Sequence, residues 1–320
     1  YWSKPELSAR VFVGRESEMA RLRAISTQVV GGNFRSILLR GPDGIGKSSV
    51  LRRFIFSAAA DEHAPSYLVS CQKIGEGIPF AAISDLLEQM SHDPAVGATD
   101  TAWLAEASRI SPSIKLAFSG VGNPPVTPPE TARVRLAEAI KHMLVAAADG
   151  KPVYLAFDDV QFLDHASRDV LHILAKKLER LPVLLLAAVR SEEIGVGSGA
   201  GSHYEGVEWQ GVLDLEPFTD AQVEELVESI SRQDPPTTAG VVSKIVELSE
   251  GRPLLAEMLV ADWEKSGPNS LVAASTSGNK SCVKWCPPET IRSAYARQFH
   301  GLSKCGQRLL HLLATAGRRM

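Results

Sequence analysis

Apolar and polar positions alternate in two different ways along the first two thirds of this chain. Short, mainly apolar runs occupy residues 36–40, 67–71, 152–159, 183–189 and 212–215. Their short length favours strands, and the continuous apolarity of the third run up to its two final carboxylates is typical of a parallel strand covered on both faces. Between them, apolar residues recur at helical spacing. This alternation predicts an α/β fold with a five-stranded parallel sheet and helices on both of its faces.

Five segments of the same region have helical spacing. One starts at Glu16 and ends at Gly31-Gly32, and the others cover residues 49–55, 80–90, 130–148 and 166–180. Asp164 is placed to cap the last of them. Over residues 91–129 the pattern weakens and prolines indicate loops.

The pattern changes after the last predicted strand. Residues 220–232, 239–249 and 254–265 give three helical patterns with no strand between them, which predicts a small all-α domain. Polar residues then form a linker. The last residues give two more helical patterns that are too few for a core of their own. We therefore expect a first domain over 1–217, a helical domain over 218–266, a linker over 267–288 and an incomplete domain over 289–320.

Eight consecutive residues, Gly41 to Ser48, match the phosphate-binding pattern G-x-x-x-x-G-K-[ST]. They lie between a predicted strand and a predicted helix, where the motif's mechanism requires them. Glycines let the backbone approach an anion, whose oxygens then accept from loop amides and from the helix N-terminus. Lys47 would reach the β- and γ-phosphates, and the Ser48 hydroxyl would ligate Mg²⁺. The nucleotide-binding set is Gly41, Asp43, Gly44, Ile45, Gly46, Lys47, Ser48 and Ser49.

Two carboxylates, Asp158 and Asp159, end the third predicted strand. Ligands of open α/β sheets bind at that end of the strands. Asp158 would therefore hold Mg²⁺, and Asp159 would orient or deprotonate the attacking water. Arg190, at the end of the fourth strand, would lie beside the phosphate loop and read the γ-phosphate. Lys47, Asp159 and Arg190 are the candidate catalytic residues.

Composition narrows the partners and the compartment. The 320 residues are 44% hydrophobic and 22% charged, as in ordinary soluble domains, and the net charge of -3 gives no general signal for nucleic acid. Four cysteines are too few for a disulfide scaffold, which favours the cytoplasm, or the nucleus of a eukaryote if the protein associates with DNA. We expect no membrane partner because the apolar runs are short. The chain begins with Tyr1, so the sequence leaves room for a longer gene product.

Taken together, the motifs resemble the STAND class of signal-transduction ATPases, which is related to the AAA+ proteins. The resemblance is to the branch of MalT-like and large LuxR-type regulators. It rests on Phe12-Val13-Gly14-Arg15-Glu16, Gly41 to Ser48, Asp158 to Asp164, Arg190, Leu215 to Phe218 and Gly251-Arg252-Pro253. Residues 287–292, followed by Leu302-Ser303, are similar to the opening of that branch's winged-helix domain.

The resemblance implies further roles. The backbone of Val11, Phe12, Val13, Gly14 and Arg15 would line the adenine pocket. Pro253, in a helical lid, would close over the base or ribose. ADP would hold the helical and winged-helix parts against the ATPase core, and ATP would open the molecule for self-association or binding of a protein partner. ATP, ADP and Mg²⁺ are thus the expected ligands, with slow hydrolysis to ADP and phosphate. DNA would be contacted only through further domains or partners.

Three alternatives remain from the sequence. An origin-recognition (Orc/Cdc6-like) AAA+ ATPase also joins an ATPase core to a winged helix and binds DNA directly. A nucleotide-binding scaffold would use the same loop without useful hydrolysis. A small-molecule kinase is the third, although nothing in the sequence resembles an acceptor site.

Overall fold

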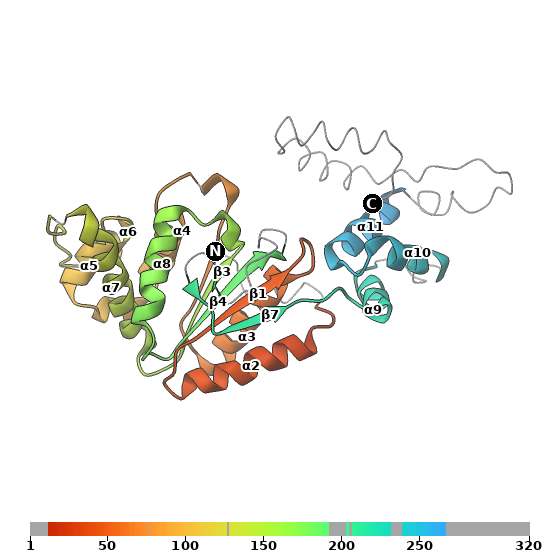
Figure 1. Ribbon diagram of the computed structural model, residues 1–320, viewed down its shortest axis with the longest axis horizontal. Helices are drawn as coiled ribbons and strands as arrows, with labels where there is room; N and C mark the ends of the chain where they lie inside the picture. Colours follow the sequence, from red (N-terminus) through yellow and green to blue (C-terminus); the bar gives the residue numbers. More distant parts are fainter. Residues whose placement is uncertain are drawn as a thin grey trace. The chain divides into compact units, whose positions relative to one another are not determined.

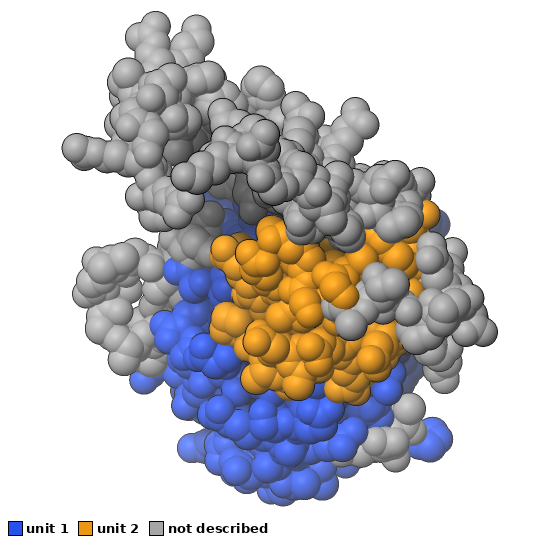
Figure 2. Space-filling model, turned by 90° about the vertical axis from the view of Figure 1, so that its right-hand side faces the viewer, with its two compact units in different colours: residues 1–7, 14–216 blue, residues 8–13, 217–320 orange. Residues whose placement is uncertain are grey.

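A computed structural model describes residues 12–75, 77–126, 128–191, 203–204, 207–231 and 239–266. The chain divides into two compact units, Tyr1–Leu7 with Gly14–Glu216 and Ser8–Val13 with Pro217–Met320, which Figure 2 colours separately. The expected linker over 267–288 and the expected winged-helix piece over 289–320 lie outside the described residues.

The first unit contains the predicted five-stranded parallel sheet. Its strands are β1 (Arg35–Gly41), β2 (Ser66–Ser70), β3 (Val153–Asp158), β4 (Val183–Arg190) and β7 (Gly211–Asp214). They run in the order β2-β3-β4-β1-β7, and every neighbouring pair is parallel (Figure 1). The α/β fold and all five predicted strands are thus confirmed.

The register of the sheet brings the strand ends together. Gly41 of β1 pairs with Arg190 of β4, and Ser70 of β2 pairs with Asp158 of β3. Because all strands run the same way, their carboxyl ends share one edge of the sheet. The loops that follow β1, β3 and β4 therefore start at neighbouring points.

Helices cover both faces of this sheet. They are α2 (Glu16–Val30), α3 (Lys47–Glu62), α4 (Ala81–Ser91), α7 (Pro129–Ala148) and α8 (His165–Lys177). Figure 1 shows α4, α7 and α8 on one side of the sheet, and α2 and α3 on the other. Single turns of 3₁₀ helix occur at η1 (Lys73–Gly75), η2 (Pro94–Ala98) and η3 (Val160–Phe162).

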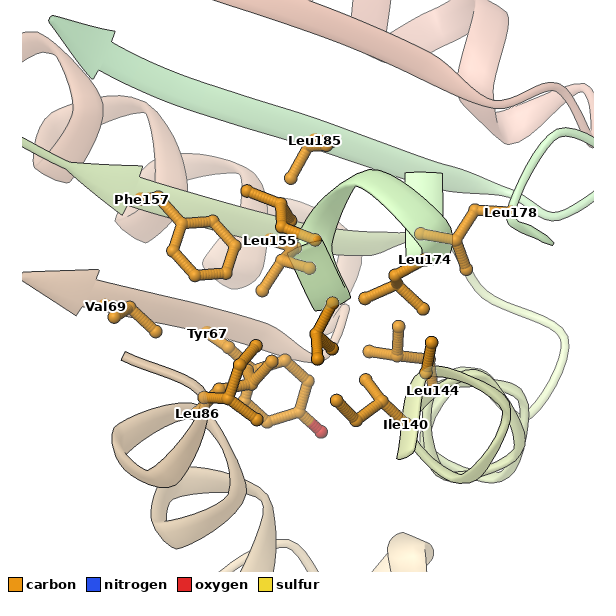
Figure 3. Packing of buried hydrophobic residues seen from close by; sticks show 14 of the residues in the cluster. Tyr67, Val69, Leu86, Ile140, Leu144, Leu155, Phe157, Leu174, Leu178 and Leu185 are labelled. Carbon is orange, nitrogen blue, oxygen red and sulfur yellow. The ribbon is translucent and has the colours of Figure 1, made fainter. Parts of the chain in front are cut away.

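Residues of opposite parity on the strands face these two layers. Leu155 and Phe157 of β3 pack with Leu185 of β4 against Leu86, Ile140 and Leu174 of the helices α4, α7 and α8 (Figure 3). Tyr154 points the other way. Its ring meets Phe54 of α3 edge-on at 5.8 Å, and its hydroxyl is 2.6 Å from the Ser26 hydroxyl of α2. Alternation along a strand produces this division.

Two short helices occupy the segment for which loops were expected. They are α5 (Thr101–Ala107) and α6 (Ser113–Ala117), and Asp100 caps α5 by accepting from the Ala102 amide. The expectation was wrong because helices of seven and five residues are too short to show a period. Tertiary packing stabilises them, since Leu104 and Ile114 are buried in the main core.

A two-stranded antiparallel ribbon, β5 (His203–Tyr204) and β6 (Val207–Glu208), precedes β7 and was not predicted either. Strands of two residues carry no recognisable pattern of their own. The ribbon is followed by Gln210, whose amide donates to the Ser36 hydroxyl of β1.

The second unit contains the three predicted helices, α9 (Asp220–Ile230), α10 (Ala239–Ser249) and α11 (Pro253–Ser266). They share a core with Val13, formed by Val223, Leu226, Val227, Val241, Ile245, Ala256, Leu259, Val260 and Trp263. Thr219 and Gln222 form a capping box at the start of α9.

Gly251 joins α10 to α11 and has a positive φ of 70°. A Cβ at this position would lie 2.5 Å from the Phe218 carbonyl oxygen, so the close approach requires glycine. Pro253 is the first residue of α11, where its missing amide costs no hydrogen bond.

No helix in the described part of the chain is long and apolar enough to cross a membrane.

We predict that Glu138→Gln weakens the contact between α7 and α8 in a pH-dependent way. Glu138 accepts from Lys141 and Lys177, and these two bonds lower the pKa of its carboxyl to about 2. A depressed carboxyl pKa stabilises the fold above the unfolded pKa, and this contribution is lost as pH falls toward 2. The variant should lose about 1 kcal/mol of unfolding free energy at pH 7, and the difference should shrink below about pH 4.5.

The measurement is urea unfolding from pH 7 down to pH 3. Glu179→Gln is the matched control, since Glu179 is exposed just after α8 and should show no such trend. A difference for Glu138→Gln that stays constant over this pH range would contradict the assignment.

Candidate functional site

The loop from Gly41 to Ser48 joins β1 to α3 and has the backbone that an anion cradle needs. Gly44 and Gly46 have positive φ angles of 75° and 101°, which other residues rarely adopt. Gly46 is the N-cap of α3, and no described side chain caps that helix end. The first amides of α3 are therefore available to an anion at the loop.

Lys47 lies in this loop with its side chain 5% exposed. Its Nζ donates to the carbonyl oxygens of Gly41 and Pro42, each at 2.9 Å. The ammonium group is thus positioned over the loop by neutral acceptors. Such bonds are weaker than those an ammonium group makes to an anion.

Arg15 ties the turn before α2 to the phosphate loop. Its backbone is left-handed, its guanidinium is buried, and its Nη2 donates to the Ile45 carbonyl at 3.0 Å. Glu18 pairs with the same guanidinium at 2.8 Å. The resemblance gave Arg15 a backbone role only, so this side-chain contact is a new finding.

The other residues expected to line an adenine pocket are placed as follows. Val11 lies outside the described residues. Phe12 is half-buried, Val13 belongs to the core of the helical unit, and Gly14 has a positive φ of 63°.

Asp158 ends β3 and is buried, with 3% of its surface exposed. Burial raises the pKa of its carboxyl, and the neighbouring Asp159 charge raises it further, while the Ser48 hydroxyl and Arg52 lower it. Arg52 Nη2 is 3.6 Å from Oδ2. Oδ1 is buried without a hydrogen-bond partner in the described part of the chain. A buried carboxylate that has such an oxygen and interacts with a serine hydroxyl is suited to a hard cation such as Mg²⁺.

Asp159 follows directly and has a left-handed backbone with φ of 55°. This conformation is uncommon for a residue other than glycine and turns the chain sharply after the strand. Its Oδ1 accepts from Gln161 Nε2 at 2.7 Å and lies 3.7 Å from Arg190 Nε. The side chain is about one-third exposed, so it is within reach of solvent.

Arg190 is the last residue of β4, and its side chain extends toward Asp43 and Asp159. Its Nη1 is 3.1 Å from Asp43 Oδ2 of the phosphate loop, and its guanidinium lies 5.6 Å from the centre of the Phe162 ring. The Gln161 side chain connects the two strand ends, because its Oε1 also accepts from the Arg190 amide at 3.4 Å. The structure thus brings Asp43, Lys47, Asp158, Asp159 and Arg190 to one edge of the sheet.

Asp164 holds two helix starts behind this edge. Its carboxylate accepts from the Ser167 amide of α8 and from the Phe80 amide just before α4. The predicted capping of α8 is confirmed, and the bond to α4 could not be foreseen because the two residues are 84 positions apart.

Sequence reasoning missed the side-chain contact of Arg15, and it missed Arg52 and Gln161. A signal existed for Arg52, which lies four residues after Ser48 and so on the same face of α3. The contacts of Arg15 to Ile45 and of Gln161 to the Arg190 amide join residues that only the fold brings near each other.

A family model described as an AAA ATPase domain matches residues 11–186. The match covers more than half of the chain, so this protein belongs to the AAA ATPase domain family. Its phosphate loop and twin aspartates lie within the matched residues. No curated protein matches the chain.

Solved structures share the fold at low sequence identity. The match to the Aeropyrum pernix Orc2 protein with ADPNP and ADP covers 98% of this chain and 79% of the Orc2 chain, with 12% sequence identity and a TM-score of 0.52. The Aeropyrum pernix Orc1 protein in complex with DNA is 17% identical over 78% of this chain, with a TM-score of 0.47. Cdc6p from Pyrobaculum aerophilum is 16% identical over 85%, with a TM-score of 0.48.

This chain spans 60% of the length of the Orc1 structure and 66% of the Cdc6p structure. At 12% identity the likeness to Orc2 shows a common fold.

Proposed function

We propose that this chain binds ATP and ADP with Mg²⁺ at the Gly41–Ser48 loop, hydrolyses ATP slowly, and uses the nucleotide as a conformational switch. One observation carries the proposal. A glycine-rich anion cradle with a buried lysine lies next to a buried aspartate whose Oδ1 has no hydrogen-bond partner among the described residues.

The loop fits a polyphosphate. Backbone amides at the uncapped start of α3 would donate to phosphate oxygens, and the positive end of the helix would favour their charge. Lys47 would exchange two carbonyl acceptors for charged phosphate oxygens, and such charge-assisted bonds are about twice as strong as neutral ones. Gly41, Asp43, Gly44, Ile45, Gly46 and Ser49 complete the proposed binding set.

Ser48 and Asp158 fit the metal. Both present oxygen, the ligand type that Mg²⁺ prefers, and Asp158 Oδ1 has no hydrogen-bond partner in the described part of the chain. When bound, the metal neutralises phosphate charge and polarises the phosphoryl oxygens. The Asp158 carboxylate lies at the end of β3, and Arg52 partly balances the charge of this carboxylate.

Asp159 is the proposed acceptor of the proton from the attacking water. Its Oδ1 is oriented by the Gln161 amide, and its partly exposed side chain gives water access to it. Arg190 is the proposed reader of the γ-phosphate, since its guanidinium lies between the phosphate loop and Asp159.

The finer proposal is a STAND-type regulator of transcription or signalling. The motif set supports it, together with the three-helix unit that follows the sheet directly in sequence. In this proposal the helical unit is a lid, Val11 to Arg15 line the adenine pocket, and Pro253 closes on the base or ribose. A ligand that contacts two states differently shifts their populations, so ADP would favour the closed state and ATP the associating one.

The alternative is an origin-recognition type AAA+ ATPase that binds DNA. The fold shared with the Aeropyrum pernix Orc2 protein supports it. The net charge of -3 gives no general signal for binding to the phosphate backbone and so argues mildly against it.

We predict that Lys47→Ala lowers the affinity for both ATP and ADP by about a hundredfold, because it removes charge-assisted bonds to phosphate. Isothermal titration calorimetry with ADP and a non-hydrolysable ATP analogue, each with Mg²⁺, measures this. Lys176→Ala is the control, since Lys176 is exposed on α8. Unchanged affinity in Lys47→Ala would refute the nucleotide site.

We predict that Asp159→Asn retains nucleotide binding within about threefold and lowers the hydrolysis rate at least about a hundredfold, since general-base catalysis contributes about 10²–10⁴. Phosphate release under single-turnover conditions measures the rate. If the wild-type rate stays at background and Asp159→Asn leaves it unchanged, the chain is a nucleotide-binding scaffold instead.

We predict that exchanging bound ADP for a non-hydrolysable ATP analogue increases the particle mass, because only the ATP state associates. Light scattering after size exclusion measures the mass in each state, first without DNA and then with duplex DNA at two salt concentrations. A mass that does not depend on the nucleotide, with salt-dependent DNA binding by the chain alone, would favour the origin-recognition alternative.

A further inference from the structure

Asp43 is an acidic residue inside a loop that matches a polyanion-binding motif. Backbone amides and Lys47 suffice for the cradle, and a carboxylate beside it repels phosphate. Its side chain is 45% exposed, so packing in the core does not explain why this position has an aspartate. Asp43 Oδ2 forms an ion pair of 3.1 Å with Nη1 of Arg190, which lies 147 positions further along the chain.

The backbone of Arg190 is fixed by the sheet, whereas its side chain is able to change partner. The β1–β4 ladder pairs Arg190 with Gly41, and Gln161 accepts from its amide. The guanidinium meets Asp43 through Nη1, Asp159 at 3.7 Å and the Phe162 ring. A partly exposed pair of this kind contributes about 1 kcal/mol at most, so a stronger anion can replace Asp43.

We propose that Asp43 competes with the γ-phosphate for Arg190 and thereby lowers the preference of the site for ATP over ADP. The inference rests on the proposed nucleotide site and adds a specificity-determining residue to it. With a diphosphate, the Asp43–Arg190 pair persists. With a triphosphate, Arg190 leaves Asp43 for the terminal phosphate, and the Asp43 charge loses its partner. Only the triphosphate state bears this cost.

Asp43→Asn tests the proposal, because asparagine keeps the shape of the side chain and suits the same turn. Affinities for Mg·ADP and for a non-hydrolysable Mg·ATP analogue are measured by calorimetry in wild type, Asp43→Asn, Arg190→Gln and the double variant. Asp43→Asn should raise the affinity for the ATP analogue about fivefold, which is about 1 kcal/mol, and that for ADP less than about twofold.

The Arg190→Gln background separates competition from simple repulsion. Without Arg190, Asp43→Asn should change the ATP-over-ADP preference by no more than about twofold, since the exchange of partners is gone. An equal gain for both nucleotides, a loss of ATP affinity, or the same fivefold shift in both backgrounds would overturn the proposal.

The pair Arg40–Asp214 supplies a matched control. Its arginine and aspartate side chains are 28% and 48% exposed, close to the 27% and 45% of Arg190 and Asp43, and it joins β1 to β7. Asp214→Asn should leave both affinities within about twofold of wild type. Loss of affinity in Lys47→Ala with an unaltered preference in Asp43→Asn would remove this inference alone, whereas no nucleotide binding by the wild type would remove the proposed function as well.

Discussion

The parallel pairing of β1 with β4 is the constraint on which the rest of the candidate site depends. It places Gly41, where the phosphate loop starts, directly opposite Arg190. Pairing of β3 with β4 then sets the twin aspartates beside them. A shift of one residue in either ladder would turn every buried side chain to the wrong face, so the core of Leu155, Phe157 and Leu185 maintains the register. The packing that stabilises the sheet therefore also determines the geometry of the site.

Charge at this edge is balanced locally between carboxylates and arginines. Arg52 is paired with Asp158, and Arg190 lies between Asp43 and Asp159. Both contacts to the twin aspartates exceed 3.5 Å, so they compensate charge without the geometry of a strong bidentate bond. A cation near Asp158 and an anion near Arg190 can therefore each replace a modest interaction with a better one. This arrangement suits a site in which ligands change the partners of fixed groups.

Most of the fold could be read from residues close together in sequence. The strands are mainly apolar, and β3 and β4 are apolar up to their last residue because both faces of the sheet are covered there, while the long helices show their period. The segment that holds α5 and α6 was misread, since such short helices depend on burial of residues such as Leu104 and Ile114. In the site, the loop glycines, Lys47, Ser48 and the twin aspartates could be predicted because each motif consists of residues that are close together in sequence. The contacts of Arg15 to Ile45 and of Gln161 to the Arg190 amide could not be predicted, because these partners are 30 and 29 positions away.

The sequence by itself predicted an ATPase related to the AAA+ proteins, because the phosphate-binding motif specifies both a backbone shape and the groups that act there; the STAND branch stays a proposal. It also gave the order of the five sheet strands and the long helices, since hydrophobic period is a local property, but not the short elements α5, α6, β5 and β6. Only the tertiary structure decided which groups meet across the sheet edge. Asp43 and Arg190 are adjacent because β1 and β4 are neighbours, although β2 and β3 lie between them in the chain. Side-chain contacts between distant residues follow from the register of hydrogen bonds and from packing, and neither is written in the spacing of residues along one strand.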